Sequence, residues 1–335
     1  MKQRRPRIAL VLGDPSGIGP ELVARLLADP STLQSADVLV IADPEQLARG
    51  MEVAQRHTHL ARIASLDAAL FDQGPALLPH EMDAAGGFEC GVSNAASGAY
   101  AMQTLLKTLE AAKKGVVDAI VFAPLNKHAL HLAGMETADE LHWFARQLDH
   151  KGPVCEFNVL DGLWTSRVTS HIAHKDVAAQ ITQTGVEQAI ELLHRAMQGS
   201  GVETPRIAVC GLNPHNGDNG SFGREEIDII GPAVAGARAN GIAAEGPFAA
   251  DTVFLKVQGE QRQFDGVVTM YHDQGQIAMK LMGFWRGVTV QGGLPIPILT
   301  PAHGTAFDIA GQGKANPGAT LQAFQLACRM VNSRH

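Results

Sequence analysis

Three histidines each follow directly after a short apolar run. They are His171 in VTSHIAHKD, His215 in CGLNPHNGDNG and His272 in MYHDQGQIAMK. Imidazole is the commonest metal ligand, and three imidazoles leave positions on a catalytic ion open for substrate oxygens. The spacing lacks a local metal signature such as H-E-x-x-H, so two interpretations stay open: a shared metal site, or polar loops that end strands. His174, one helical turn from His171, is expected to be a surface neighbour.

Two carboxylates and a lysine accompany these histidines. Asp273 directly follows His272, Lys280 comes seven residues later in a helical pattern, and Asp251 lies in GPFAADTVF. A carboxylate beside a metal can ligate it, orient a histidine ligand or act as a base. From the sequence alone, the favoured interpretation of Asp251 is a helix N-cap.

Two glycine-rich segments are candidates for ligand binding. LGDPSGIGPE (Leu12–Glu21) follows a predicted strand and opens a helix, but it is neither G-x-G-x-x-G nor a P-loop. A tight structural turn is favoured there over a ligand loop. HGTAFDIAGQGKANPG (His303–Gly318) is dense in Gly and Ala, which lets a flat ligand approach the backbone closely. Its alternative interpretation is a surface turn.

The elements that must position these residues alternate between strand and helix. This alternation predicts an α/β protein with a mostly parallel sheet, in which functional residues gather at the carboxyl ends of strands. Strands are predicted at 8–12, 38–42, 119–122, 154–158, 163–169, 206–210, 267–271 and 288–291. Helices are predicted at 17–28, 45–56, 93–114, 139–148, 180–197, 225–240 and 317–331.

Composition narrows the classes of function. The 335 residues are enough for two domains. The net charge of −7 argues against nucleic acid as a partner, since phosphate binding needs a basic surface. No apolar run reaches the ~20 residues that span a membrane. The four cysteines are far apart and form no CxxC pair, which favours a cytoplasmic location.

Seven motifs, in order, resemble the 4-hydroxythreonine-4-phosphate dehydrogenase (PdxA) family. They are GDPSGIGPE, APLNKHALHLAG, TSH with KD, CGLNPHNGDNG with EEID, GPFAADTVF, YHDQGQIAMK and HGTAFDIAGQGKA. The loop from His303 also resembles the adenine-binding loop of isocitrate and isopropylmalate dehydrogenases. Together the motifs cover essentially the whole chain.

The resemblance implies an α/β/α two-domain fold of the isocitrate and isopropylmalate dehydrogenase type, with the active site in a cleft between domains. We expect a cofactor domain of residues 1–125 and 275–335, and a metal, substrate and dimerisation domain of residues 126–274. The implied assembly is a homodimer that binds a small-molecule substrate.

The resemblance also implies a divalent metal (Zn, Mg, Mn, Co or Ni) held by His171, His215 and His272 from both subunits. Asp251, Asp273 and Lys280 are the candidates for proton handling, and Lys280 also for substrate contact. The cofactor is expected to be NAD or NADP. Its predicted contacts are His303, Gly304, Thr305, Ala306, Asp308 and Asn316.

The chain departs from the family where substrate is held. The family's Thr-Gly-His-Thr-Glu motif aligns so that its His and Thr become Glu140 and Leu141, unless a slip brings His142 into place. Two further family contacts, an Asn and an Arg, fall at Thr289 and Ile298. Thr137 and Glu140 instead match a capping box.

These departures predict poor binding of phosphate. A carboxylate ~4 Å from a phosphate costs roughly 4 kcal/mol per charge pair at an intermediate dielectric. Some relatives oxidise cis-dihydrodiols of aromatic carboxylates, such as terephthalate dihydrodiol, with loss of CO2, and the sequence favours that substrate class. The alternative is a phosphorylated substrate, either 4-phosphohydroxythreonine or a phosphosugar acid. A non-catalytic binding protein and an acyl- or phosphotransferase are the other readings left open.

Overall fold

The computed structural model describes residues 4–68, 71, 74–81, 89–259 and 262–334. Its contacts divide the chain into two compact units, Met1–Lys151 with Leu294–His335, and Gly152–Gly293. The sequence reading divided the chain at 125/126 and 274/275 instead. The first boundary differs because α5 (Lys127–Leu132) contacts α4 (Ala95–Lys113) of the first unit. The second differs because α11 (His272–Gly283) contacts strands of the second unit.

The first unit contains a parallel sheet whose strand order is β3-β4-β2-β1-β5-β12. Four residues of β1, from Ile8 to Val11, are buried, as expected of a strand covered on both faces. The strands are β1 (Arg7–Val11), β2 (Asp37–Ala42), β3 (Ala61–Arg62), β4 (Ala76–Pro79), β5 (Ala119–Phe122) and β12 (Ile298–Pro301).

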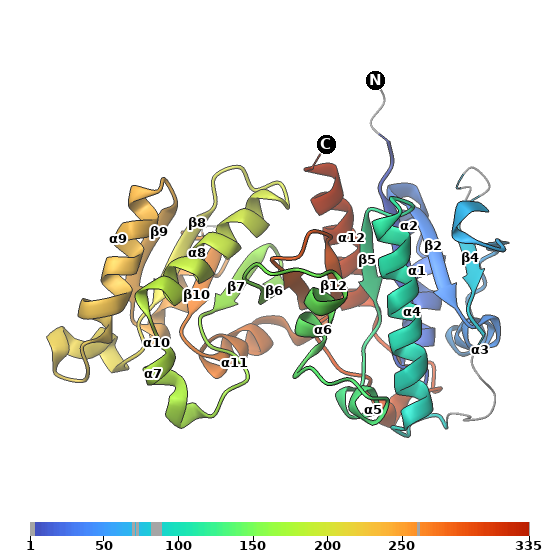
Figure 1. Cartoon of the computed structure of the whole chain (residues 1–335), viewed down its shortest axis with the longest axis horizontal. Coiled ribbons are helices and arrows are strands. Elements are labelled where there is room, and N and C mark those ends of the chain that lie inside the picture. The colour runs from blue at the N-terminus through green and yellow to red at the C-terminus, as the bar shows by residue number, and fades with distance from the viewer. Residues whose placement is uncertain (1–3, 69–70, 72–73, 82–88, 260–261, 335) are drawn as a thin grey trace. The chain divides into compact units, whose positions relative to one another are not determined.

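Helices cover this sheet. Helix α4 packs on β1, β2 and β5, and α12 (Gly318–Asn332) packs on β5 and β12. In Figure 1 α4 lies across the near side of these strands. The remaining helices of the unit are α1 (Gly19–Ala28), α2 (Pro30–Ser35), α3 (Pro44–Ala54) and α6 (Glu140–Gln147).

The second unit has a mixed sheet with the strand order β11-β6-β7-β10-β8-β9. Strands β6 and β7, close to the strands predicted at 154–158 and 163–169, form an antiparallel hairpin, whereas β7, β10, β8 and β9 run parallel. The strands are β6 (Cys155–Leu160), β7 (Leu163–Arg167), β8 (Arg206–Cys210), β9 (Ala243–Phe248), β10 (Gly266–Thr269) and β11 (Val288–Gly292). The helices besides α11 are α7 (Val177–Gln180), α8 (Gln183–Gln198), α9 (Gly231–Ala239) and α10 (Ala250–Val253). Both units confirm the predicted α/β fold with mostly parallel strands.

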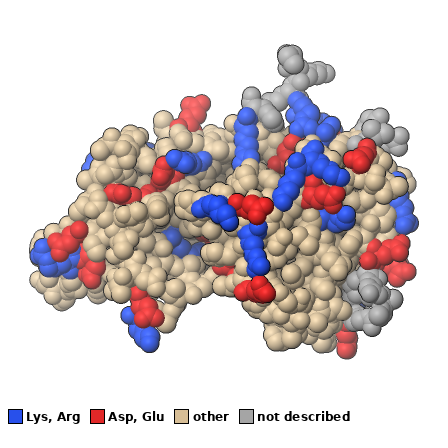
Figure 2. Space-filling model, viewed as in Figure 1, with Lys and Arg blue, Asp and Glu red and all other residues tan. Residues whose placement is uncertain are grey.

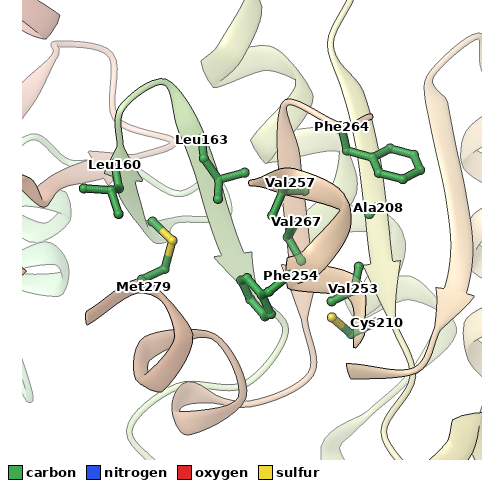
Figure 3. Packing of buried hydrophobic residues seen from close by; sticks show 10 residues of the cluster. All are labelled: Leu160, Leu163, Ala208, Cys210, Val253, Phe254, Val257, Phe264, Val267 and Met279. Atoms are coloured by element: carbon green, nitrogen blue, oxygen red, sulfur yellow. The ribbon is translucent and has the colours of Figure 1, made fainter. Parts of the chain in front are cut away.

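A buried apolar cluster fixes the helices of the second unit against its strands. Its members come from β6, β7, β8, β10, α10 with the turn that follows it, and α11, and Figure 3 shows them around the strand of Val267. Met279 joins the cluster from α11, and Phe254 joins it from the turn after α10. The cluster therefore anchors α11, the helix that begins at His272.

Truncating Phe254 should destabilise this unit strongly. The side chain is 8% exposed, so Phe254→Ala removes buried apolar area and leaves a cavity. Removal of a buried aromatic side chain typically costs about 3–5 kcal/mol, so we expect a loss of about 3 kcal/mol in the free energy of unfolding. Urea denaturation measures it. The control is the neighbouring Leu255→Ala, which is 70% exposed and should change stability by less than about 0.5 kcal/mol.

The surface carries charges of both signs. On the face drawn in Figure 2, Lys and Arg side chains are interspersed with Asp and Glu and form no continuous basic surface. Among the helices in the described part of the chain, none is long and apolar enough to cross a membrane.

Candidate functional site

Two of the predicted histidine ligands lie side by side in the second unit. Strands β7 and β10 are parallel neighbours, with Arg167 in register with Thr269. Beyond the strands, the amide of Thr169 donates to the carbonyl of Met270 at 3.0 Å. The loops that follow therefore leave the same edge of the sheet. The ring centroids of His171 and His272 are 5.8 Å apart.

His272 is oriented by its neighbour. Its Nδ1 lies 2.7 Å from Oδ1 of Asp273. This hydrogen bond lowers the pKa of Asp273, and the nearby ammonium of Lys280 adds a smaller effect in the same direction. With Nδ1–H donated to the carboxylate, Nε2 carries the lone pair that a metal requires. The pair of imidazoles and the orienting carboxylate therefore fit a divalent metal in donor type.

The third histidine is brought to the same edge but not into a ligand cluster. Strand β8 is the other parallel neighbour of β10, and His215 lies five residues beyond its end. The ring of His215 lies 6.5 Å from that of Phe222. Within the residues that the structure describes, no three or more His, Cys, Asp or Glu side chains form a group that could hold a metal. That a second subunit completes the site stays a prediction.

Two polar residues that sequence reasoning missed hold these loops, the half-buried Gln274 and the buried Arg167. Oε1 of Gln274 accepts from the amide of Met270 at 2.7 Å, and its Nε2 donates to the carbonyl of Gly211 at 2.8 Å. Gln274 therefore joins the ends of β10 and β8. Arg167, 6% exposed, donates from Nε to Oγ of Ser170, beside His171. The signal available in the sequence was a polar residue within an otherwise apolar strand or helix face, which indicates a side chain that binds other parts of the protein.

Asp251 is not the N-cap that the sequence favoured. It lies in the first turn of α10, whose N-cap is Ala249 without a side-chain hydrogen bond. Strand β9 ends at Phe248, so the helix begins two residues earlier than a cap at Asp251 requires. Asp251 is exposed, and its helix contacts the 214–220 segment that carries His215.

Lys280 is exposed in the last turn of α11.

The predicted cofactor loop belongs to the first unit and is tied to α1. The amide of Ile18 donates to the carbonyl of Thr305 at 3.1 Å. Oε1 of Glu21 accepts from the amide of Ala315 at 3.0 Å, and Arg25 donates to the carbonyl of Gly313 at 2.8 Å. Sequence reasoning did not single out Glu21 or Arg25. Both hold the 313–315 end of the loop, whereas the amide of Ile18 holds the end at Thr305. Gly304, Asp308 and Asn316 are exposed in this loop.

Two further features of the loop bear on ligand binding. Burial lowers the pKa of His303, with a smaller opposing effect from its hydrogen bond to Gly304. Ala306 has φ 44°, a left-handed conformation that is uncommon for a residue with a side chain. Both features indicate a loop held in one defined conformation.

The glycine-rich segment Leu12–Glu21 forms a hydrogen-bonded turn, as favoured from the sequence. The amide of Gly17 donates to the carbonyl of Asp14, whose Oδ1 accepts from the amide of Ser16. A Cβ at Gly17 would lie 2.7 Å from the carbonyl oxygen of Thr305, so glycine permits the close approach of the two loops. The turn therefore supports the predicted cofactor loop.

The capping box expected at Thr137 and Glu140 is wrong. Helix α6 begins at Glu140, and its N-cap is Asp139, whose carboxylate accepts from the amide of His142 at 3.0 Å. Asp139 displaces Thr137 because its side chain reaches the third helical amide directly. His142 is exposed, and its Nδ1 lies 2.6 Å from Oδ1 of Asp139.

Three positions aligned with family substrate contacts are buried. Leu141 is 4% exposed, Ile298 is 0% exposed, and Thr289 is 7% exposed with its hydroxyl accepting from Nδ2 of Asn158 at 3.2 Å. Apolar residues at such positions are what a protein core requires, so they carry little information about substrate. Glu140, at the first turn of α6, is half-buried.

Comparisons with known proteins point to one family. Residues 34–327 match the family model for the pyridoxal phosphate biosynthetic protein PdxA. The chain is 60% identical to a Pseudomonas aeruginosa protein named "Putative 4-hydroxythreonine-4-phosphate dehydrogenase 2", with 97% of each covered. It is 37% identical to the D-threonate 4-phosphate dehydrogenase of Pectobacterium atrosepticum, covering 97% of this chain and 99% of that one.

Solved structures agree with this family. The 4-hydroxythreonine-4-phosphate dehydrogenase of Klebsiella pneumoniae matches with a TM-score of 0.84 and 35% identity over 99% of both chains. The terephthalate 1,2-cis-dihydrodiol dehydrogenase of Burkholderia xenovorans matches less well, with a TM-score of 0.67 and 27% identity over 97% of this chain and 98% of that chain. The expected family fold is confirmed.

The preference for a dihydrodiol carboxylate is wrong. The similarity is higher to proteins named for phosphorylated substrates than to the dihydrodiol enzyme. The error has a physical source: Leu141 and Ile298 are buried in the first unit, so their apolar character reflects the protein core and does not argue against a phosphorylated substrate.

Proposed function

The chain belongs to the PdxA family, and we propose that it is a dehydrogenase of a phosphorylated hydroxy acid, such as 4-phosphohydroxythreonine or D-threonate 4-phosphate. The observation that carries the proposal is the likeness, over almost the whole chain, to proteins named for these substrates. The side-by-side imidazoles of His171 and His272 support the chemistry. The reaction oxidises the hydroxyl β to the carboxylate, and CO2 leaves from the β-keto acid.

The residues divide this work between them. When bound, a divalent cation polarises the substrate hydroxyl and carboxylate, and NAD or NADP accepts the hydride. His171 and His272 would hold the cation, with His215 as the third ligand, and Asp273 keeps His272 in the required tautomer. Asp251 and Lys280 are the groups that would take and return the proton of the hydroxyl. The loop of residues 303–316 would hold the adenine end of the cofactor.

We also propose that the active protein is a homodimer. In one chain His171 and His272 lie side by side, but the described residues form no group of three or more metal ligands. A shared site would receive its third ligand from a second copy of the chain. Large apolar side chains are exposed on α11 and the turn after it: Ile277 at 59%, Leu281 at 84% and Trp285 at 59%. Apolar groups in this density on a helix beside the site suit a second copy of the chain. Sedimentation at micromolar concentration tests the proposal, and a monomeric mass would contradict it.

A substrate panel with NADH or NADPH absorbance as the readout tests the function. The panel contains 4-phosphohydroxythreonine, D-threonate 4-phosphate, their unphosphorylated forms and terephthalate dihydrodiol, each with Mn²⁺ or Zn²⁺. We expect turnover of at least one phosphorylated acid, with kcat/KM at least roughly 100-fold above its unphosphorylated form, because losing charge-assisted phosphate contacts costs several kcal/mol. Equal rates with and without the phosphate would refute the proposal.

A further inference from the structure

The segment that carries His215 has a backbone conformation that L-residues rarely adopt in succession. His215, Asn216, Gly217, Asp218 and Asn219 have φ values of 50°, 61°, 77°, 41° and 55°. Only the glycine adopts this left-handed region without a steric penalty. Such a turn persists only where its surroundings hold it, and it is found most often at functional sites.

One buried carboxylate supplies much of that hold. Glu226 is 4% exposed, and its Oε1 accepts from the amides of Leu212 and Asn213, both at 2.7 Å. Its Oε2 accepts from Nδ2 of Asn213 at 3.0 Å. Burial alone raises the pKa of Glu226, but these hydrogen bonds outweigh burial and hold it below its usual value. The group is therefore a carboxylate that binds backbone at neutral pH.

The carboxylate also lies directly against the left-handed turn. A Cβ at Gly217 would lie 2.7 Å from Oε2 of Glu226, so a side chain at this position would displace one or the other. A second contact involves Asn216, whose Nδ2 donates to the carbonyl of Pro247 at 2.8 Å. The turn is thus held by the carboxylate of Glu226 and by a hydrogen bond to the end of β9.

The element that presents Glu226 is itself unusual. Residues Glu226–Ile230 form a π-helical turn before α9. π-helical turns are rare and recur at functional sites, because the extra residue changes the direction of one side chain. Here the turn begins at the residue whose side chain reaches back to the 212–217 segment.

We propose that Glu226 is a positioning residue for His215: its carboxylate fixes the left-handed turn and so holds the imidazole in the orientation that the metal requires. This inference rests on the proposed function for the role of His215. The effect of Glu226 on the turn does not depend on the proposed function, because it follows from the observed contacts of Glu226. In this role Glu226 acts through the backbone of residues 212–217 and is not itself a metal ligand.

The test is Glu226→Gln in the full-length protein. Glutamine keeps the size and one acceptor oxygen, but turns an amide donor toward Asn213. We expect the amides of residues 212–219 to exchange hydrogen at least roughly tenfold faster in the metal-free protein, since hydrogen bonds to a charged acceptor are lost. Zn²⁺ affinity, measured by competition with a fluorescent chelator, should fall about 10- to 100-fold, as for other residues that orient a metal ligand.

Asp228→Asn is the matched control. Asp228 is exposed on the same π-helical turn, and its carboxylate forms an ion pair with Arg224 at 2.8 Å. It should change neither exchange nor Zn²⁺ affinity. If Glu226→Gln does not fold, Asn213→Ala is the second variant. It removes the side-chain donor to Glu226, together with the 2.6 Å bond from Asn213 to Glu225, and keeps both backbone donors to Glu226. It should accelerate exchange at the same amides by a smaller factor.

The outcomes separate this inference from the proposed function. Unchanged exchange in Glu226→Gln, or in Asn213→Ala where that variant replaces it, would overturn the hold on the turn. Faster exchange with unchanged Zn²⁺ affinity, while His215→Ala loses affinity, would overturn the positioning role. If His215→Ala also keeps its affinity, the ligand assignment in the proposed function fails, and the positioning role fails with it.

Discussion

Replacing His272 by alanine should lower kcat/KM by at least about 1,000-fold, since a cation that polarises the reacting hydroxyl contributes several kcal/mol to the transition state. His272 lies 5.8 Å from His171, ring to ring, and its Nδ1 is held by Asp273. Removing it leaves the cation with one imidazole fewer and Asp273 without a partner ring. Initial rates at saturating Mn²⁺ or Zn²⁺, together with Zn²⁺ affinity, measure the effect.

The neighbouring His174 supplies a matched control. His174 is also exposed, and its ring lies 5.0 Å from that of Tyr271. His174→Ala should keep kcat/KM within about threefold, because an imidazole that ligates nothing contributes little to the transition state. The loss of kcat/KM in Asp273→Asn should lie between the losses in these two variants, at about 10- to 100-fold. Equal losses in the His174 and His272 variants would refute the assignment of His272 as the ligand.

The sequence predicted the central strands well because they are buried on both faces. Residues 119–122 and 206–210 are continuous apolar or nearly apolar runs, and the observed β5 and β8 have these same bounds. Strands β3, β4, β9 and β12 were missed. Strand β3 has only two residues, and each of the other three contains a proline. Proline normally argues against a strand, but here it lies at or near the end of each strand, where a missing donor is tolerated.

Helix boundaries were harder to predict where local hydrogen bonds compete. The helix predicted at 180–197 corresponds to α8, which begins three residues later, at Gln183, since Thr182 caps it through the amide of Gly185. The short helix α7 precedes it and was not predicted. The helix predicted at 225–240 begins as a π-helical turn. Periodicity gives the apolar face of a helix but does not say which side chain will bind the first amides.

The family resemblance, and not the apolar runs alone, implied that His171 and His272 lie together, and neither predicted the backbone conformation of His215. Two loops that leave neighbouring parallel strands at one edge approach each other, but the chain order does not say which strands are neighbours. A run of left-handed residues depends on a buried carboxylate eleven positions later, Glu226, and no local pattern reports it. The substrate preference failed for a related reason, since burial, not ligand contact, explains Leu141 and Ile298.

Lys280→Met should reduce turnover by about 100-fold or more, as expected when a group that transfers a proton in the transition state is removed. Lys280 is exposed in the last turn of α11, seven residues and two helical turns after Asp273, so both lie on one side of the helix. Its charge makes a small contribution to the lowered pKa of Asp273. Methionine keeps the length of the side chain and its apolar stem, so the helix should be unaffected.

Separate measurement of kcat and KM decides which role Lys280 has. A proton-transfer group lowers kcat with little change in KM, whereas a substrate anchor raises KM with kcat preserved. The control is Lys256→Met, whose ammonium lies 5.5 Å from the ring centroid of Phe248 in the same unit and is assigned no chemistry. Lys256→Met should leave kcat and KM within about twofold, since a cation that does not contact substrate contributes little to transition-state binding. A Lys280→Met protein with unchanged kcat and KM would remove Lys280 from the site, and proton handling would then fall to Asp251.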